Sequence, residues 1–341
     1  MVMKGSPKHF VESDRARAAW LSAQQASFQS VRARGITNLD AHTTDSTAFW
    51  AFAESQSLVK AFHGYASSQV NPDLPMWKQQ TTRVLQTVDY LNRRRNCRPS
   101  TSEPMPYAGL TAAVLLDLPI LRPHPKQAIR VTSQVRRARR TKHTLTHTVT
   151  FTPHTIPFAD FRVTSLEQTI IDLARLYGPE HGLVAADFAL ANYLTTSERL
   201  VRLFNSLPSC HGRRNARVML DLMDGRRESV GESLMFFRFS EAGLPLPEPQ
   251  LTFWIQGQQM RPDAVDTDRR YVFAFDGNAK LTAPSMTNGR DYRDLVQDAT
   301  WKERLLADAG YKTFHLRWED VRTTDGFRRW LNSRRSFGLA Y

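Results

Sequence analysis

The stretch YVFAFDGNAK, residues 271–280, decides how the C-terminal part of this chain is interpreted. As a β-strand it has two unlike faces, because successive strand side chains point in opposite directions. One face carries Tyr271, Phe273 and Phe275, and the other carries Val272, Ala274 and Asp276. On the second face, the side chain of Ala274 is only a methyl group, and it lies next to the Asp276 carboxylate. Either Ala274 makes room for a neighbour, or a group that works with Asp276 is missing.

The residues around this stretch predict helix, three strands, helix, strand and helix. The first helix, VGESLMFFRFSEAGLP, carries Glu232 in its first turn. The three strands are QLTFWIQ, MRPDAV (which contains Asp263) and RYVFAFDG at 270–277. RDLVQDATWKERLLADAG then predicts a crossover helix and YKTFHLRW a strand, so the last two strands should be parallel. The carboxyl end of the third strand, with Asp276, would then lie at the edge of the sheet where sites form.

The middle of the chain predicts an α+β region. AIRVTSQV and HTLTHTVTFT have strand patterns, and VTSLEQTIIDLARLYGPEHGLVAADFAL predicts two helices, with Thr164 and Glu167 as a capping box at the start of the first. Asp172 and Asp187 lie inside these helices, where we expect ion pairs with arginines rather than catalysis. The proline-rich CRPSTSEPMP (97–106) predicts a boundary before this region.

Residues 1–98 contain three stretches with helical patterns, and the second is rich in aromatic residues. Such a stretch predicts core or a surface for a protein partner. The expected fold class is therefore α/β. It comprises a helical N-terminal region (1–98), an α+β middle (99–225) and a mixed sheet flanked by helices (226–341).

The charge of the chain favours a polyanionic partner such as DNA. Lys and Arg number 46 against 33 Asp and Glu, which gives a net charge of +13. Clustered cations bind phosphates by releasing counterions, although an arginine-rich proteome also produces basic surfaces. From clustering alone, the expected phosphate contacts are Arg136, Arg137, Arg139, Arg140, Arg213, Arg214 and Lys302.

The sequence lacks the signals of several other classes of protein. No apolar stretch approaches the ~20 residues of a membrane span, and the first residues lack a secretory signal, so a cytoplasmic protein is expected. Cys97 and Cys210 lie outside any disulfide or zinc spacing. His143 and His147, four apart on a strand, would be roughly 13 Å apart, too far to share a metal. The phosphate-loop and GxSxG signatures are also absent.

Five stretches together resemble an actinobacterial family that joins an AbiEi-type antitoxin-like region to a C-terminal endonuclease-like domain. They are VTSLEQTIIDLAR, GESLMFFRFSEAGLPLPEPQ, RPDAVD, FDGNAK and KERLLADAGYKTFHLRWEDV. The C-terminal domain of that family is related to very-short-patch-repair endonucleases and has the PD-(D/E)XK, or restriction-endonuclease-like, fold. The resemblance covers about 106–321 and leaves 1–98 unassigned.

This resemblance implies a metal-dependent nuclease site. Glu232, Asp263 and Asp276 are the implied ligands of Mg²⁺ (or Mn²⁺), and Lys280 would stabilise the developing charge or the nucleophile. The family pattern also expects a glutamate eleven positions after Asp263, where this chain has Ala274. The missing glutamate accounts for the small side chain at position 274 of the strand.

Three hypotheses about function follow from Ala274. The first is an endonuclease of a defence or toxin–antitoxin system in which an acidic residue at 274 has been replaced, inactivating the site. The second is a naturally inactive nuclease fold that binds DNA as a regulator or antitoxin-like component. The third is a scaffold for a protein partner, based on the N-terminal helices. The intact Asp263, Asp276 and Lys280 favour the nuclease lineage.

Overall fold

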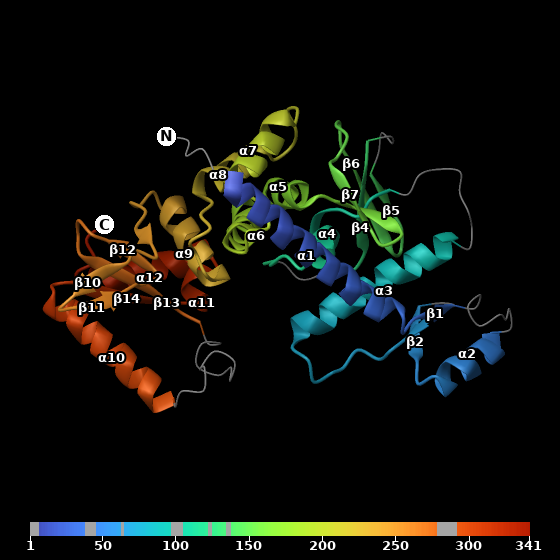
Figure 1. Ribbon diagram of the computed structural model, residues 1–341, viewed down its shortest axis with the longest axis horizontal. Coiled ribbons are helices and arrows are strands. Elements are labelled where there is room, and N and C mark those ends of the chain that lie inside the picture. The colour runs from blue at the N-terminus through green and yellow to red at the C-terminus, as the bar shows by residue number, and fades with distance from the viewer. Residues whose placement is uncertain are drawn as a thin grey trace. The chain divides into compact units, whose positions relative to one another are not determined.

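The computed structural model describes residues 7–37, 46–62, 65–96, 105–121, 125–133, 138–277 and 292–341. The chain has the expected mixed α/β character, with both helices and sheets (Figure 1). By its internal contacts it divides into two compact units. Unit 1 comprises Met1–Ala185 and Asn192–Asp221, and unit 2 comprises Ala186–Ala191 and Leu222–Tyr341. The finer division into three domains stays a prediction. Within the described ranges, no helix is both long enough and apolar enough to cross a membrane.

The first part of unit 1 combines three helices with a small sheet. The helices are α1 (Pro7–Arg32), α2 (Ser46–Ser55) and α3 (Met76–Asn96). The strands are β1 (Ile36–Thr37), β2 (Val59–Phe62) and β3 (Tyr65–Ser67), antiparallel in the order β1-β3-β2. The sequence predicts the three helices but not this sheet, because strands of two to four residues are too short to show a period. The second predicted helix, TDSTAFWAFAESQSLVKAF, is wrong at its end, since Val59–Phe62 form β2.

One buried carboxylate holds this part of unit 1 together. Asp89 of α3 is fully buried and accepts hydrogen bonds from the Tyr65 hydroxyl at 2.7 Å and from Arg93 Nε at 3.0 Å. Arg32 Nε, at the end of α1, lies 3.6 Å from the same carboxylate. Burial raises the pKa of Asp89, and the two guanidinium groups act in the opposite direction. Asp89 therefore links β3, α3 and α1 through one charge.

The second part of unit 1 places two β-elements among short helices. Strands β4 (Ala128–Thr132), β6 (Thr144–Thr148) and β5 (Arg139–Arg140) form one sheet in that order, with β4 and β6 parallel. β7 (Thr155–Phe158) and β8 (Phe161–Thr164) form an antiparallel pair. The helices are α4 (Gly109–Leu115), α5 (Leu166–Tyr177), α6 (Pro179–Ala191), α7 (Ser197–Ser206) and α8 (Arg213–Leu222). The last residues of α6, from Ala186, and of α8, at Leu222, belong to unit 2.

The helix pair α5 and α6 confirms the sequence prediction except at its first cap. The N-cap is Ser165, whose Oγ accepts from the Gln168 backbone N–H, and not Thr164. Glu167 instead holds Arg17 of α1, with Oε1 2.6 Å from Nη1. Glu167 therefore pairs with a residue of a distant helix and does not make the local capping bond that the sequence pattern predicts. Asp172 pairs with Arg175 at 2.6 Å, as expected for an acid inside this helix.

Unit 2 is built on a four-stranded sheet in the order β14-β13-β12-β9. The strands are β9 (Glu248–Pro249), β12 (Ala264–Asp266), β13 (Tyr271–Asp276) and β14 (Lys312–Arg317). β13 and β14 are parallel, and the other neighbouring pairs are antiparallel. The parallel pair is the one predicted from the crossover helix between the last two strands.

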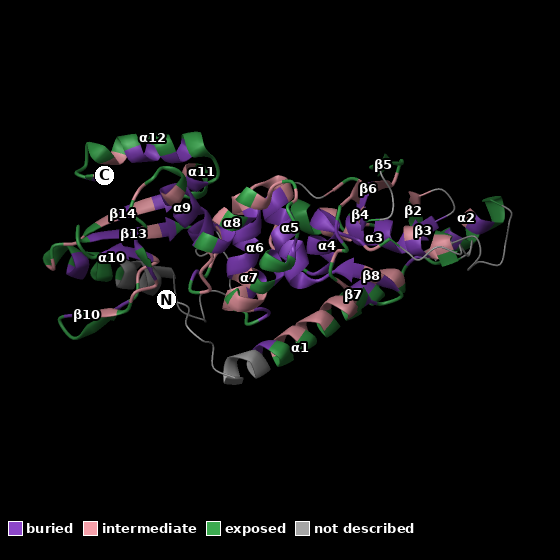
Figure 2. Ribbon diagram, turned by 90° about the horizontal axis from the view of Figure 1, so that it is seen from above, coloured by how far each residue is buried: buried purple, intermediate pink, exposed green. Residues whose placement is uncertain are grey.

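Helices cover both faces of this sheet (Figure 2). α9 (Val230–Glu241), α11 (Trp318–Val321) and α12 (Thr324–Arg335) lie on the aromatic side of β13, and α10 (Tyr292–Asp308) lies on the other. Phe273 is fully buried against Phe239 of α9 on the first side. On the second side, Val272 packs with Leu305 and Leu306 of α10. The alternation read from the sequence is thus realised as two buried layers.

The predicted first strand of this sheet is wrong in detail. QLTFWIQ supplies β10 (Phe253–Ile255), which pairs with β11 (Gln258–Met260) in a separate hairpin. The edge strand of the main sheet is β9, and it contains Pro249. Proline is tolerated at a sheet edge because the missing N–H is not needed there. A two-residue strand with a proline gives no alternation to read from the sequence.

A buried ion pair fixes the segment that leads into α9. Arg227 and Asp187 are 4% and 1% exposed, and Arg227 Nη1 lies 2.8 Å from Asp187 Oδ2. The other oxygen of Asp187 accepts the Asp224 backbone N–H at 2.8 Å. Burial raises the pKa of Asp187 to about 6, against the opposing effect of Arg227. Asp187 thus forms an ion pair with an arginine inside the fold, as the sequence predicts.

We predict that the substitution Arg227→Met lowers the free energy of unfolding by about 3 kcal/mol at pH 7, because it leaves a buried carboxylate without its cation. The loss should shrink as the pH falls from 7 towards 6, because without Arg227 the pKa of Asp187 rises further and its carboxylate becomes protonated. A carboxyl group whose pKa is raised in the folded state adds stability at low pH and loses it as the pH rises through that pKa. Urea unfolding at pH 5 and pH 7 measures both effects.

The matched control is Arg328→Met, which removes an exposed ion pair with Asp325. It should change the free energy of unfolding by less than about 0.5 kcal/mol at either pH. Equal losses for the two variants would contradict a special role for the buried pair.

Candidate functional site

Glu232 enters the candidate site from the first turn of α9. Ser229 is the N-cap, and its Oγ accepts the Glu232 backbone N–H at 3.2 Å. The Glu232 carboxylate in turn accepts from Ser229 Oγ at 2.8 Å and from the Glu228 backbone N–H at 3.0 Å. The Glu232 carboxylate thus returns a hydrogen bond to the residue before the N-cap, so Glu232 helps to begin the helix as well as facing the site.

Asp263 lies just before β12 and closes the ladder between β12 and β13. Its Oδ2 accepts the backbone N–H of Phe275 at 2.8 Å. Ala264 pairs with Phe273, so the same antiparallel register carried one residue further sets Asp263 beside Ala274. The side chain therefore replaces a main-chain acceptor at the carboxyl end of β13.

Asp263 lies close enough to Glu232 to affect the ionisation of Glu232. Burial raises the pKa of Glu232, which is 1% exposed, and the charge of Asp263 raises it further. Gln250 joins the pair: its Nε2 donates to Glu232 Oε2 at 3.0 Å, and its backbone N–H donates to the Asp263 carbonyl at 3.1 Å. Two of the predicted site residues thus meet at the predicted edge of the sheet.

Ala274 lies between Asp263 on one side and His315 on the other. In the parallel register Ala274 pairs with His315 of β14, and partners in such a pair share a face of the sheet. Position 274 is half-buried and supplies only a methyl group. A longer acidic side chain at this position would extend from the same edge as the neighbouring carboxylates.

Asp276 takes part in a second polar chain on the same edge. Its Oδ2 lies 3.0 Å from His315 Nδ1, and His315 Nε2 lies 2.8 Å from Glu303 Oε1 of α10. Each of the three side chains is about half exposed, at 40% to 51%. The imidazole links acids from two different elements, and both of its nitrogens are engaged. Asp276 is therefore bonded to His315, which no sequence signal had singled out.

The predicted cationic residues fall into three groups. Lys280, Arg136 and Arg137 lie outside the described residues. Arg139, Arg140, Arg214 and Lys302 are exposed. Arg213 is engaged within unit 1: its Nη1 donates to the Leu207 carbonyl at 2.7 Å, and its guanidinium lies 4.1 Å from the centroid of the Phe204 ring.

The carboxylate oxygens at this edge of the sheet do not form a Mg²⁺ site in their present arrangement. Magnesium needs oxygen ligands at about 2.0–2.1 Å in near-octahedral geometry. The Glu232 carboxylate and Asp263 Oδ2 already accept hydrogen bonds that a cation would have to replace, and Ala274 offers no oxygen. Within the described ranges, no three His, Cys, Asp or Glu side chains are grouped so that they could hold a metal ion.

Comparisons with models of known protein families, with curated proteins and with solved structures find no match for this chain.

Three residues at this edge escaped the sequence analysis: Gln250, Glu303 and His315. Gln250 has a positive φ of 52°, and its only sequence signal was its place at the end of PLPEPQ. His315 lies at an alternate position of a predicted strand, and Glu303 lies on a predicted helix. Only the tertiary fold brings these two elements beside Asp276.

We predict that Asp263→Asn lowers the pKa of Glu232, because it removes the neighbouring charge that raises it. The asparagine oxygen can still accept the Phe275 N–H, so the ladder is kept. A ¹³C NMR titration of the Glu232 carboxyl measures the shift. Asp276→Asn, with the same loss of charge, is the control and should leave this pKa unchanged. An unchanged pKa in Asp263→Asn would show that the two acids are not coupled.

Proposed function

We propose that unit 2 is a DNA-binding domain of the PD-(D/E)XK endonuclease lineage whose cleavage site lacks an acidic ligand at position 274. The order of elements supports this: helix α9, strands β9, β12 and β13, helix α10 and parallel strand β14. A mixed sheet flanked by helices is the fold that the sequence resemblance implies.

The observation that carries the proposal is the setting of Ala274. The coupled acids Glu232 and Asp263 lie at the carboxyl end of β13, and the register sets position 274 beside Asp263. Hydrolysis of a phosphodiester requires charge neutralisation at the phosphate and an activated water, which acids around a divalent cation provide. An alanine in this place supports a loss of cleavage for the chain as it stands, and the net charge of +13 supports binding of DNA.

We predict that Ala274→Glu gains binding of Mg²⁺ or Mn²⁺ and nicks supercoiled plasmid when either metal is added. The new carboxylate would extend beside Asp263 and complete a set of acidic ligands. Calorimetric titration with Mn²⁺ measures metal binding, and gel analysis of plasmid measures cleavage.

Ala274→Gln is the matched control, because it has the same length without the charge. It should neither bind the metal nor nick DNA. Ala274→Glu combined with Asp263→Asn should lose the gain. If Ala274→Glu behaves like Ala274→Gln in both measurements, the proposed lineage of this site is wrong.

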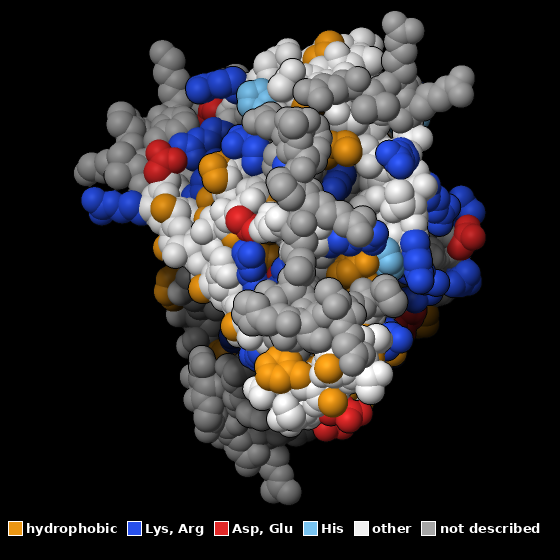
Figure 3. All heavy atoms as spheres, turned by 90° about the vertical axis from the view of Figure 1, so that its right-hand side faces the viewer, with side chains coloured by type: hydrophobic (Ala, Val, Ile, Leu, Met, Phe, Trp, Pro, Cys, Tyr) orange, Lys and Arg blue, Asp and Glu red, His pale blue; other side chains and the backbone are white. Residues whose placement is uncertain are grey.

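The basic surface of unit 1 supports DNA as the ligand of the whole chain. Lys and Arg side chains outweigh acidic ones on the face drawn in Figure 3, where they are scattered and not joined in a single patch. Arg139 and Arg140 of β5 are exposed, and so is Arg214 of α8. A basic chain that holds DNA without cutting it also fits the antitoxin-like setting that the resemblance implies. A protein partner for the N-terminal helices remains a separate proposal.

We predict that Arg139→Gln with Arg140→Gln weakens duplex DNA binding and reduces its dependence on salt. Loss of two phosphate contacts should lower the slope of log K against log salt by about 2. Fluorescence anisotropy at several salt concentrations measures the slope. The control is Arg15→Gln with Lys78→Gln, which removes the same charge from exposed positions of α1 and α3. Equal slopes in the two double variants would count against β5 as a DNA contact.

A further inference from the structure

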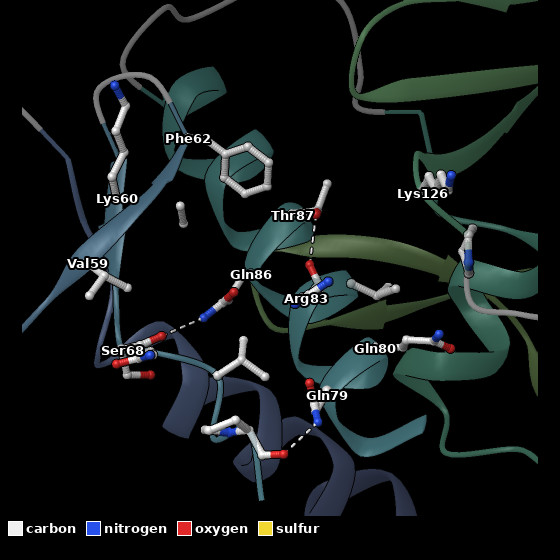
Figure 4. A pocket seen from close by; sticks show the side chains of 16 residues that line it. Val59, Lys60, Phe62, Ser68, Gln79, Gln80, Arg83, Gln86, Thr87 and Lys126 are labelled. Carbon is white, nitrogen blue, oxygen red and sulfur yellow. Dashed lines mark hydrogen bonds between the residues drawn. The ribbon is translucent and has the colours of Figure 1, made fainter. Parts of the chain in front are cut away.

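A groove of about 780 Å³ lies within unit 1, between strand β2, helix α3 and the segment at Lys126 (Figure 4). Its volume falls in the range of roughly 300–1,000 Å³ that small-molecule sites occupy. None of the phosphate contacts expected from the sequence lines it. The groove is therefore a feature that the proposed function leaves unexplained.

The groove is lined by cations without acids. Lys60, Arg83 and Lys126 all contribute to its walls, and none of the described lining residues is Asp or Glu. In the part of the chain that the structure describes, neither Arg83 nor Lys126 has a carboxylate partner. This differs from Arg17 and Arg175 of the same unit, each of which is held by a carboxylate at 2.6 Å. A concave surface with unneutralised positive charge attracts anions.

Lys60 has a different role from the other two cations. Its Nζ lies 5.3 Å from the centroid of the Trp50 ring, in a cation–π contact. In Figure 4 its ammonium group points away from Arg83, whereas Arg83 lies at the centre of the view and Lys126 on the opposite side. Arg83 and Lys126 are thus the cations placed to hold one anion.

Hydrogen bonds fix the walls of the groove without using these two cations. Gln79 Nε2 donates to the carbonyls of Pro72 and Leu74, at 3.0 Å and 2.8 Å. Gln86 Nε2 donates to the Ser68 carbonyl at 2.9 Å. Both amides hold the segment after β3 against α3, so the groove exists before any ligand binds. A preformed site loses less entropy on binding than one that must be ordered.

An aromatic ring forms part of the same lining. Phe62 is half-buried and stacks on Tyr90, with ring centroids 4.8 Å apart and an interplanar angle of 18°. His143 meets the same ring edge-on at 5.3 Å. A ring held in place beside cations is the combination that proteins use to bind nucleotides, stacking the base and pairing the phosphate.

We propose that this groove binds a phosphorylated nucleoside, with its phosphate on Arg83 and Lys126 and its base against Phe62. The ligand is either a free nucleotide or one nucleotide of a single strand, since both present a phosphate and an aromatic base. This site belongs to unit 1 and does not rest on the function proposed for unit 2.

The test uses the full chain and two probes: AMP by calorimetry and a short fluorescein-labelled oligothymidylate by anisotropy. Arg83→Gln and Lys126→Gln should each weaken binding of the recognised probe about tenfold, as expected for loss of a charged hydrogen bond. Phe62→Leu should weaken it about fivefold or more, and Phe62→Tyr should retain it. Binding of AMP identifies a free nucleotide as ligand, and binding of the oligonucleotide alone identifies a strand.

Lys78→Gln is the matched control, because Lys78 lies on α3 and is exposed but does not line the groove. It should bind the probes like the unaltered chain. The proposal is overturned if neither probe binds, or if Arg83→Gln and Lys126→Gln bind as Lys78→Gln does. Arg83 and Lys126 are exposed, so their variants should fold even if those at Phe62 do not.

Discussion

Burial of the Phe273 ring determines what lies at the edge of unit 2. The ring is fully buried, and its centroid lies 4.9 Å from that of Phe239, 5.8 Å from that of Phe314 and 6.3 Å from that of Tyr341. A slip of one residue in β13 would turn this aromatic side away from the helices that cover it. The packing of one face therefore fixes Ala274 and Asp276 on the other, next to β12 and β14.

The acidic residues at this edge stabilise the fold independently of any metal. Glu232 caps α9 and binds Gln250, and Asp263 completes the hydrogen bonding of β13. A buried carboxylate is costly unless donors surround it, and these donors supply that compensation. The helix and the sheet therefore need Glu232 and Asp263 whether or not an acid stands at position 274. Under the lineage proposed above, a nuclease site could lose that acid without loss of the fold.

Unit 1 distributes its charges in two ways. Some cations are neutralised within the fold: Arg93 and Arg32 surround the buried Asp89, and Arg17 holds Glu167. Others, such as Arg83 and Lys126, face a preformed groove. The first kind stabilises the arrangement of helices, and the second kind leaves positive charge available to an anionic ligand. A net charge of +13 does not distinguish the two kinds; the partners of each side chain do.

The sequence alone determined features that depend on local periodicity. The alternation in 271–276 predicted the two faces of β13, the crossover helix predicted the parallel pair, and Asp187 was expected to bind an arginine. Tertiary structure decided what short or isolated residues do: the sheet of β1, β2 and β3, the edge strand β9, the cap at Ser165 and the meeting of Asp276, His315 and Glu303. The physical reason is the separation along the chain of the residues that interact. A repeating pattern records which face is buried, whereas a contact between distant elements leaves no trace in the residues beside it.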